Sequence, residues 1–124
     1  MRYMMFIKHT EDYRGLHVPP ALDEAMGQFV GEYIAKGKFV DGAGLKSTHR
    51  AKKIRLSGGK LSVVDGPFTE SKEIIGGYAI LDLESDEEAL EVAMQFMELH
   101  RIHMPTFEGE SELRVMEDGA PGSE

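Results

Sequence analysis

The clearest pattern in the chain is an apolar stripe at helical spacing in its first third. Pro20 stands just before it, where a proline suits the first turn of a helix because no needed donor is lost. Gly37 follows it, and glycine is typical of the position after a helix end. The spacing therefore predicts one helix over about residues 20–36. Its apolar positions are Leu22, Ala25, Met26, Phe29, Val30, Tyr33 and Ile34.

A second helix is predicted to begin after Ser85. The run Ser85-Asp86-Glu87-Glu88 is typical of a capping box, in which Ser85 accepts from the Glu88 amide while Glu88 reaches back. The apolar pattern that follows is broader than in the first helix, which indicates burial on more than one side. Its members are Leu90, Val92, Ala93, Met94, Phe96, Met97 and Leu99.

Short apolar runs predict strands at 3–7, 39–45, 77–83 and 112–116. Between them, apolar residues alternate on both sides of Gly58-Gly59, which is typical of a β-hairpin with a two-residue turn. The element order is then β-α-β, hairpin, β-α-β. This order predicts an α+β fold, a ferredoxin-like split β-α-β with an inserted hairpin.

One face of such a sheet is left without cover, because two helices cover only the other. The run 3–7 (Tyr-Met-Met-Phe-Ile) is apolar on both faces of its strand. An exposed apolar face of that size marks a partner surface. We therefore expect a homodimer in which two sheets pack against each other.

The composition narrows the class of protein. The 124 residues suit one domain, taken as 1–117 with a flexible acidic tail at 118–124. The net charge of −8 disfavours a nucleic-acid partner. No cysteine is present, and no apolar run approaches the ~20 residues that span a bilayer. We expect a cytoplasmic protein without a membrane partner.

The densest group of special residues is 65–72, Asp-Gly-Pro-Phe-Thr-Glu-Ser-Lys. Asp65 stands at the end of an apolar strand, and Gly66 with Pro67 turns the chain sharply there. Beside Phe68 in an apolar cleft, Asp65 would have a raised pKa and act as a general acid or base. Asp before Gly-Pro also makes turns by capping backbone amides. Both interpretations stay open.

Two histidines near the end of the second helix share one face. His100 and His103 lie three residues apart, but a metal needs a third ligand, so no metal site is expected. Cationic side chains at a helix C-terminus also complement its dipole. His100 is retained as a candidate for acid–base chemistry. His9 follows the first strand, where it can line the mouth of a pocket.

The segment 65–72, with Gly76-Gly77 before Tyr78, resembles the signature of the DGPF-domain proteins, a branch of the YCII-related family in the dimeric α/β-barrel superfamily. The element order and the run 41–45 (Asp-Gly-Ala-Gly-Leu) agree with it. The resemblance implies face-to-face dimers with a pocket in each half. It also implies an acid–base dyad of an Asp and a His on the first helix. Here no His lies between His17 and His49, so that dyad is not carried over.

These observations predict a cofactor-independent enzyme that acts on a small organic molecule by acid–base chemistry in a pocket of the dimer. The alternative is a non-catalytic module that binds a small molecule or regulates a partner. Asp65 and His100 are the predicted catalytic residues. The predicted ligand-binding residues are Phe68, Glu70, Lys72, Gly77, Tyr78 and His9.

Overall fold

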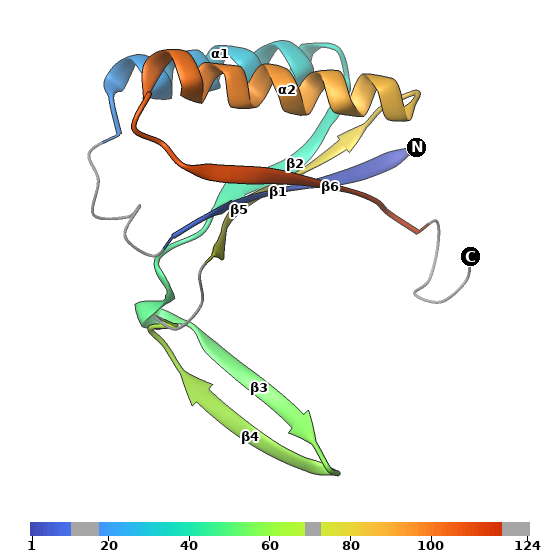
Figure 1. The fold of residues 1–124 in the computed structure, drawn as a ribbon. Coiled ribbons are helices and arrows are strands. Elements are labelled where there is room, and N and C mark those ends of the chain that lie inside the picture. Colours follow the sequence, from blue (N-terminus) through green and yellow to red (C-terminus); the bar gives the residue numbers. More distant parts are fainter. Residues whose placement is uncertain (11–17, 69–72, 118–124) are drawn as a thin grey trace.

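Two helices lie side by side on one face of a four-stranded antiparallel sheet (Figure 1). The computed structural model describes residues 1–10, 18–68 and 73–117, so the tail predicted at 118–124 lies outside the described residues. The elements are β1 (Arg2–His9), α1 (Pro20–Ala35), β2 (Phe39–Gly44), the short 3-10 helix η2 (Thr48–Arg50), β3 (Lys52–Ser57), β4 (Lys60–Asp65), β5 (Ile74–Asp82), α2 (Asp86–His103) and β6 (Gly109–Val115).

The strand order in the sheet is β2-β5-β1-β6, and all three pairings are antiparallel. Each β-α-β unit therefore has a strand of the other unit between its own two strands. This arrangement confirms the α+β prediction and is consistent with a ferredoxin-like fold. No helix in the described part of the chain is both long and apolar enough to cross a membrane.

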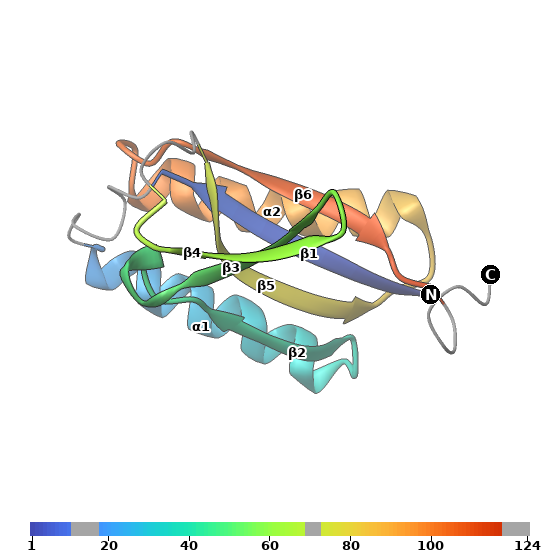
Figure 2. The same cartoon turned by 90° about the horizontal axis from the view of Figure 1, so that it is seen from below.

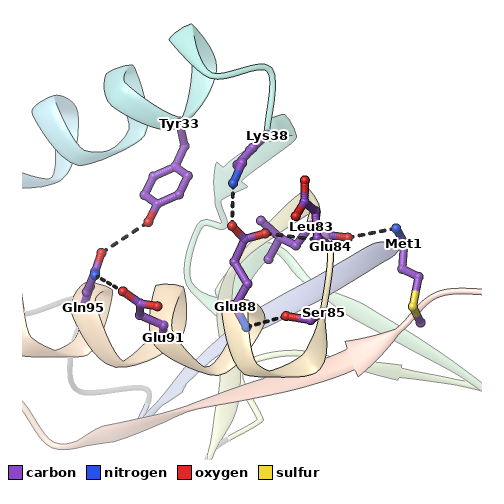
Figure 3. Close-up of polar contacts among 9 residues, drawn as sticks. All are labelled: Met1, Tyr33, Lys38, Leu83, Glu84, Ser85, Glu88, Glu91 and Gln95. Carbon is purple, nitrogen blue, oxygen red and sulfur yellow. Dashed lines mark hydrogen bonds and ion pairs between the residues drawn. The ribbon is translucent and has the colours of Figure 1, made fainter.

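The helix ends agree closely with the sequence pattern. Beyond α1, Gly37 has a φ of 72°, a conformation that glycine adopts at little cost. At the start of α2, the Ser85 hydroxyl accepts from the Glu88 amide at 3.1 Å, as predicted (Figure 3). The Glu88 carboxylate reaches back one residue further than a standard capping box requires, to the Glu84 amide at 3.0 Å.

Polar contacts tie the two helical units together at this end (Figure 3). Lys38, in the link between α1 and β2, pairs with Glu88 of α2. The Tyr33 hydroxyl of α1 donates to Gln95 Oε1 of α2 at 3.2 Å. The amino group of Met1 donates to the Leu83 carbonyl at 2.8 Å, which fixes the start of β1 beneath the α2 N-terminus.

The two faces of β1 have different surroundings. Tyr3 belongs to the hydrophobic core with residues of β5 and α2, and Met5 and His9 are buried on the same face. Met4 and Phe6 point to the opposite face, which no helix covers, and are only half-buried. The strand is therefore apolar on both faces, as its sequence indicates.

The β3–β4 hairpin projects from the sheet on the side away from the helices (Figure 1 and, seen from below, Figure 2). Gly58 and Gly59 have φ values of 59° and 75°, which a two-residue hairpin turn of this hand requires. The predicted hairpin and its turn are confirmed. Every residue of β3 is exposed, and so is nearly all of β4.

Candidate functional site

A cavity of about 470 Å³ lies between the helices and the face of the sheet that they cover. The apolar side chains of its wall come from the sheet and from both helices, and include Met5, Ile7, Met26, Phe29, Val30 and Phe96. Because the α1 stripe faces this space, part of the apolar pattern that predicts the helix lines a cavity and is not packed against the sheet.

The first imidazole of the cavity, that of His9, lies at the end of β1 and is 2 % exposed. Its Nδ1 is 2.9 Å from the Thr10 carbonyl oxygen. A carbonyl only accepts, so Nδ1 of His9 carries a hydrogen. Nε2 lies over Gly76, where an added Cβ would be 1.8 Å from it. Gly76, at the bulge in the β1–β5 pairing, thus makes the space for this ring.

The second imidazole, that of His100, comes from the last turns of α2 and is 4 % exposed. Its Nδ1 donates to the Phe96 carbonyl at 3.1 Å, and the ring packs between Phe96 and Phe107 at centroid distances of 5.0 and 4.7 Å. Burial lowers the pKa of His100, although the bond to the Phe96 carbonyl acts in the opposite direction. The ring is therefore neutral at pH 7, with its lone pair on Nε2.

The charge of the wall is also distinctive. Of the described residues that line the cavity, none is a lysine or an arginine, and Asp23 is the acidic one. Tyr33 contributes a phenol, and burial, with Glu91 as the next cause, raises its pKa. The described part of the wall thus combines apolar side chains with two buried imidazoles and contains no lysine or arginine to pair with an anion.

The model of the YCII-related domain matches residues 1–97. This chain belongs to the YCII-related family. An uncharacterized protein of Rhizobium meliloti (strain 1021), R00369, is 40 % identical over 62 residues, which cover half of each protein. The chain thus spans about half the length of this curated relative. His9 lies within the segment that matches the family, and His100 lies beyond it.

Asp65 of this YCII-related protein is not among the residues that line the cavity. It ends β4 on the projecting hairpin, its side chain is 69 % exposed, and its Oδ1 lies 2.5 Å from Lys52 Nζ. Asp65 therefore forms a side-chain ion pair across the hairpin. The structure does not bring Asp65 and His100 together, and a catalytic role for Asp65 stays a prediction.

The residues after Asp65 join the hairpin to the segment around η2. The Gly66 amide donates to the Ala51 carbonyl, and the Phe68 amide donates to Thr48 Oγ1, both at 2.9 Å. A Cβ on Gly66 would lie 1.6 Å from the Thr48 carbonyl oxygen, so only glycine fits against this backbone. Phe68 is buried here under the Lys53 ammonium, away from the cavity.

The other predicted ligand-binding residues have different positions. Gly77 and Tyr78 belong to the cavity wall. Tyr78 pairs with Phe6, so its side chain extends from the uncovered face, where its hydroxyl lies 3.4 Å from Asp41 Oδ2. Glu70 and Lys72 lie outside the described residues.

Asp23 is a wall residue that the sequence analysis missed. It lies in the first turn of α1, three residues before Met26 and seven before Val30, on the apolar stripe. An acid on that stripe is the signal that would have found it. His103 is half-buried at the end of α2 and does not line the cavity. In the described part of the chain, no three His, Cys, Asp or Glu side chains are placed to hold a metal.

Proposed function

We propose that this YCII-related protein binds a small, uncharged and mainly apolar organic molecule between its helices and its sheet, and that His100, which lines the same cavity as His9, transfers a proton of that molecule. The observation that carries the proposal is that two buried imidazoles, each with Nδ1 held by a backbone carbonyl, line one apolar cavity. Buried apolar cavities with a few convergent polar groups are the usual form of ligand sites.

The charge of the wall supports an uncharged ligand. A carboxylate or phosphate loses its hydration on entering such a site and needs a cation there in return. The described wall supplies no lysine or arginine, and the whole chain carries a net charge of −8. A neutral hydroxyl or N–H group suits the site better, because it donates to the lone pair on His100 Nε2.

The proposed chemistry is a proton shift within the ligand. Nε2 of neutral His100 removes a proton from a carbon next to a carbonyl, and the electron pair moves onto the carbonyl oxygen. A proton then returns from the imidazole to another atom of the ligand, so the isomerisation needs no oxidant, reductant or cofactor. Burial disfavours the charged imidazolium and thus favours the return of the proton.

A non-catalytic binding module is the alternative. It is favoured by the mainly apolar wall and by the position of Asp65 outside it. In this case His100 only orients the ligand through a hydrogen bond. The same experiment separates the two functions, because binding and proton transfer have different readouts.

The test compares 2-naphthol, naphthalene and 2-naphthoate, which share one ring system and differ in polar group. We expect 2-naphthol to bind best and 2-naphthoate worst, measured by NMR shifts of the Met5 and Met26 methyl groups in the wall. His100→Gln is expected to weaken 2-naphthol binding about tenfold, which is the loss of one hydrogen bond, and to leave naphthalene unchanged. The matched control is His103→Gln, which lies off the cavity.

Proton transfer is tested with 2-tetralone, a neutral ketone, by its uptake of deuterium next to the carbonyl. We expect exchange above the buffer rate that His100→Gln abolishes and His103→Gln retains. Binding without exchange would favour the non-catalytic module. Equal or tighter binding of 2-naphthoate, or no binding of any of these compounds, would overturn the proposed site.

The uncovered face of the sheet supports a homodimer. Met4 and Phe6 of β1 and their partners Ile80 and Tyr78 of β5 form a half-buried apolar strip there. A strip of this kind on an open sheet face is typical of an interface. We propose that two copies pack sheet against sheet as a dimeric α/β barrel, with one helix-covered cavity in each copy.

A further inference from the structure

The β3–β4 hairpin carries an apolar face that no other described element covers. Ile54 pairs with Val63 and Leu56 pairs with Leu61, so the four side chains lie together on one face of the ribbon. Their exposed fractions are 67, 62, 70 and 73 %. Large aliphatic side chains exposed together in this way mark an interaction surface.

The hairpin also lacks support of its own. A two-stranded ribbon is marginally stable in water unless its apolar face packs on something. Here the ribbon projects away from the sheet (Figure 1), and the bonds described above attach it only at its base, through Gly66 and Phe68. The apolar face is therefore expected to be covered in the working protein.

The charge of the hairpin indicates what covers it. The segment 52–65 contains four cations, Lys52, Lys53, Arg55 and Lys60, and one carboxylate, Asp65. The whole chain nevertheless carries a net charge of −8, so the rest of the molecule is strongly acidic. A basic arm is attracted to an acidic body, and a second copy of this chain provides one.

A surface that fits the arm lies on the same side of the molecule. The uncovered strip of Met4, Phe6, Tyr78 and Ile80 faces away from the helices, and the hairpin projects to that side (Figure 1). Along the neighbouring β6, the Glu110 and Glu112 carboxylates border this strip, and both pair with Lys8 of β1. When two sheets face each other, the hairpin of one copy extends toward the sheet of the other.

We propose that the β3–β4 hairpin is a dimerisation arm whose apolar face docks on the uncovered sheet face of a second copy. The Asp-Gly-Pro-Phe turn then anchors the arm, because Gly66 and Phe68 fix the base of the hairpin to the segment around η2. The inference rests on the homodimer proposed above and does not depend on any ligand in the cavity.

The first experiment removes the apolar face of the arm with the double variant Leu56→Ser/Leu61→Ser. The control Leu90→Ser/Met94→Ser removes two residues that are similarly exposed on α2. We expect the wild type and the control to have about twice 13.8 kDa by sedimentation equilibrium. The arm variant is expected to raise the dimer dissociation constant about tenfold or more while its circular dichroism stays native.

The second experiment uses the absence of cysteine in this chain. A Leu61→Cys protein is mixed with a Phe6→Cys protein under mild oxidation, and the control mixes Leu61→Cys with Met94→Cys. We expect a disulfide-linked heterodimer only in the first mixture, because only Phe6 lies on the proposed docking face.

Three outcomes would overturn the arm: a monomeric wild type, an unchanged dimer constant in the arm variant, or equal cross-linking in both mixtures. If the wild type is a monomer, the apolar face of the hairpin would instead bind a different acidic protein. Measuring 2-naphthol binding to the arm variant distinguishes the arm proposal from the proposed cavity site. Retained binding with a lost dimer supports the arm and leaves the cavity site intact, whereas lost binding with a retained dimer contradicts the arm and not the homodimer.

Discussion

The helix-covered side of the sheet and the projecting hairpin are built in different ways. The cavity gathers residues from distant parts of the chain, such as His9 of β1 and His100 of α2, and buries them. The hairpin and its Asp-Gly-Pro-Phe turn are formed by neighbours in the sequence and are mostly exposed. The Asp-Gly-Pro-Phe turn, the most distinctive local motif, therefore connects the hairpin to the rest of the fold. The cavity, in contrast, is formed by residues that the fold brings together from distant parts of the chain.

The two regions also use glycine differently. Gly76 leaves room for a side chain, the imidazole of His9, whereas Gly66 lets one backbone segment approach another at Thr48. A substitution at Gly76 should therefore change the cavity, and one at Gly66 should change the hairpin. The predictions below use this separation, from the largest expected effect to the smallest.

Gly76→Ala is expected to have the largest effect. Its Cβ would lie 1.8 Å from His9 Nε2, so the buried ring must move. Overpacking of this kind costs about 2 kcal/mol of unfolding free energy, which urea denaturation measures. Binding of 2-naphthol should be lost as well.

The control for this substitution is Gly44→Ala. Gly44 also lines the cavity, but an added Cβ there meets nothing within 4 Å. Its stability and binding should stay close to those of the wild type. Equal losses of stability and binding in both variants would mean that the position of the His9 ring does not depend on the missing side chain at Gly76.

Gly66→Ala should affect the other region. The added Cβ would collide with the Thr48 carbonyl, which is backbone and moves only with the chain around it. We expect the bonds from Gly66 and Phe68 to break, with a smaller loss of about 1 kcal/mol because the hairpin contributes little to the core. Hydrogen exchange should rise at these two amides and stay unchanged in β1. Lost binding of 2-naphthol would contradict the independence of the two regions.

The acid sensitivity of the fold should depend on His100. Because its pKa is lowered in the folded state, the unfolded chain binds the proton first as the pH falls below about 6.5. Stability from the neutral ring is thus present above that pH and is lost as the pH falls toward the folded pKa. We expect His100→Gln to reduce the drop in Tm between about pH 7.5 and about pH 5.5, and His103→Gln to keep it. An unchanged drop in His100→Gln would show that other groups cause it.

The sequence predicts the elements well because their periods are local properties. The α1 stripe, the Gly58-Gly59 turn and the Ser85 cap each depend on residues a few positions apart, and the structure contains all three. His9 and His100 were predicted singly as site residues. Their meeting in one cavity depends on packing between β1 and α2, which no local spacing encodes.

The same limit explains the emphasis on Asp65. A polar residue beside Gly-Pro-Phe looks like part of a site when only its sequence neighbours are considered. Its surroundings depend on whether β4 belongs to the main sheet or to a separate ribbon, and the structure shows a separate ribbon. Asp23 was missed because its sequence neighbours make it look unremarkable. An acidic residue is common in the first turn of a helix, where it complements the helix dipole.

Asp65→Asn is expected to have the smallest effect. It tests whether the functional site is the cavity or the turn at the base of the hairpin. The exposed ion pair with Lys52 contributes at most about 0.5 kcal/mol, because water screens it. Asparagine keeps the shape of the side chain, so the turn at Gly66 should persist. We expect Tm, 2-naphthol binding and deuterium exchange of 2-tetralone to stay near wild-type values. Loss of exchange with an unchanged Tm would instead give Asp65 the catalytic role that its sequence neighbours suggest, and would require the working site to include the hairpin.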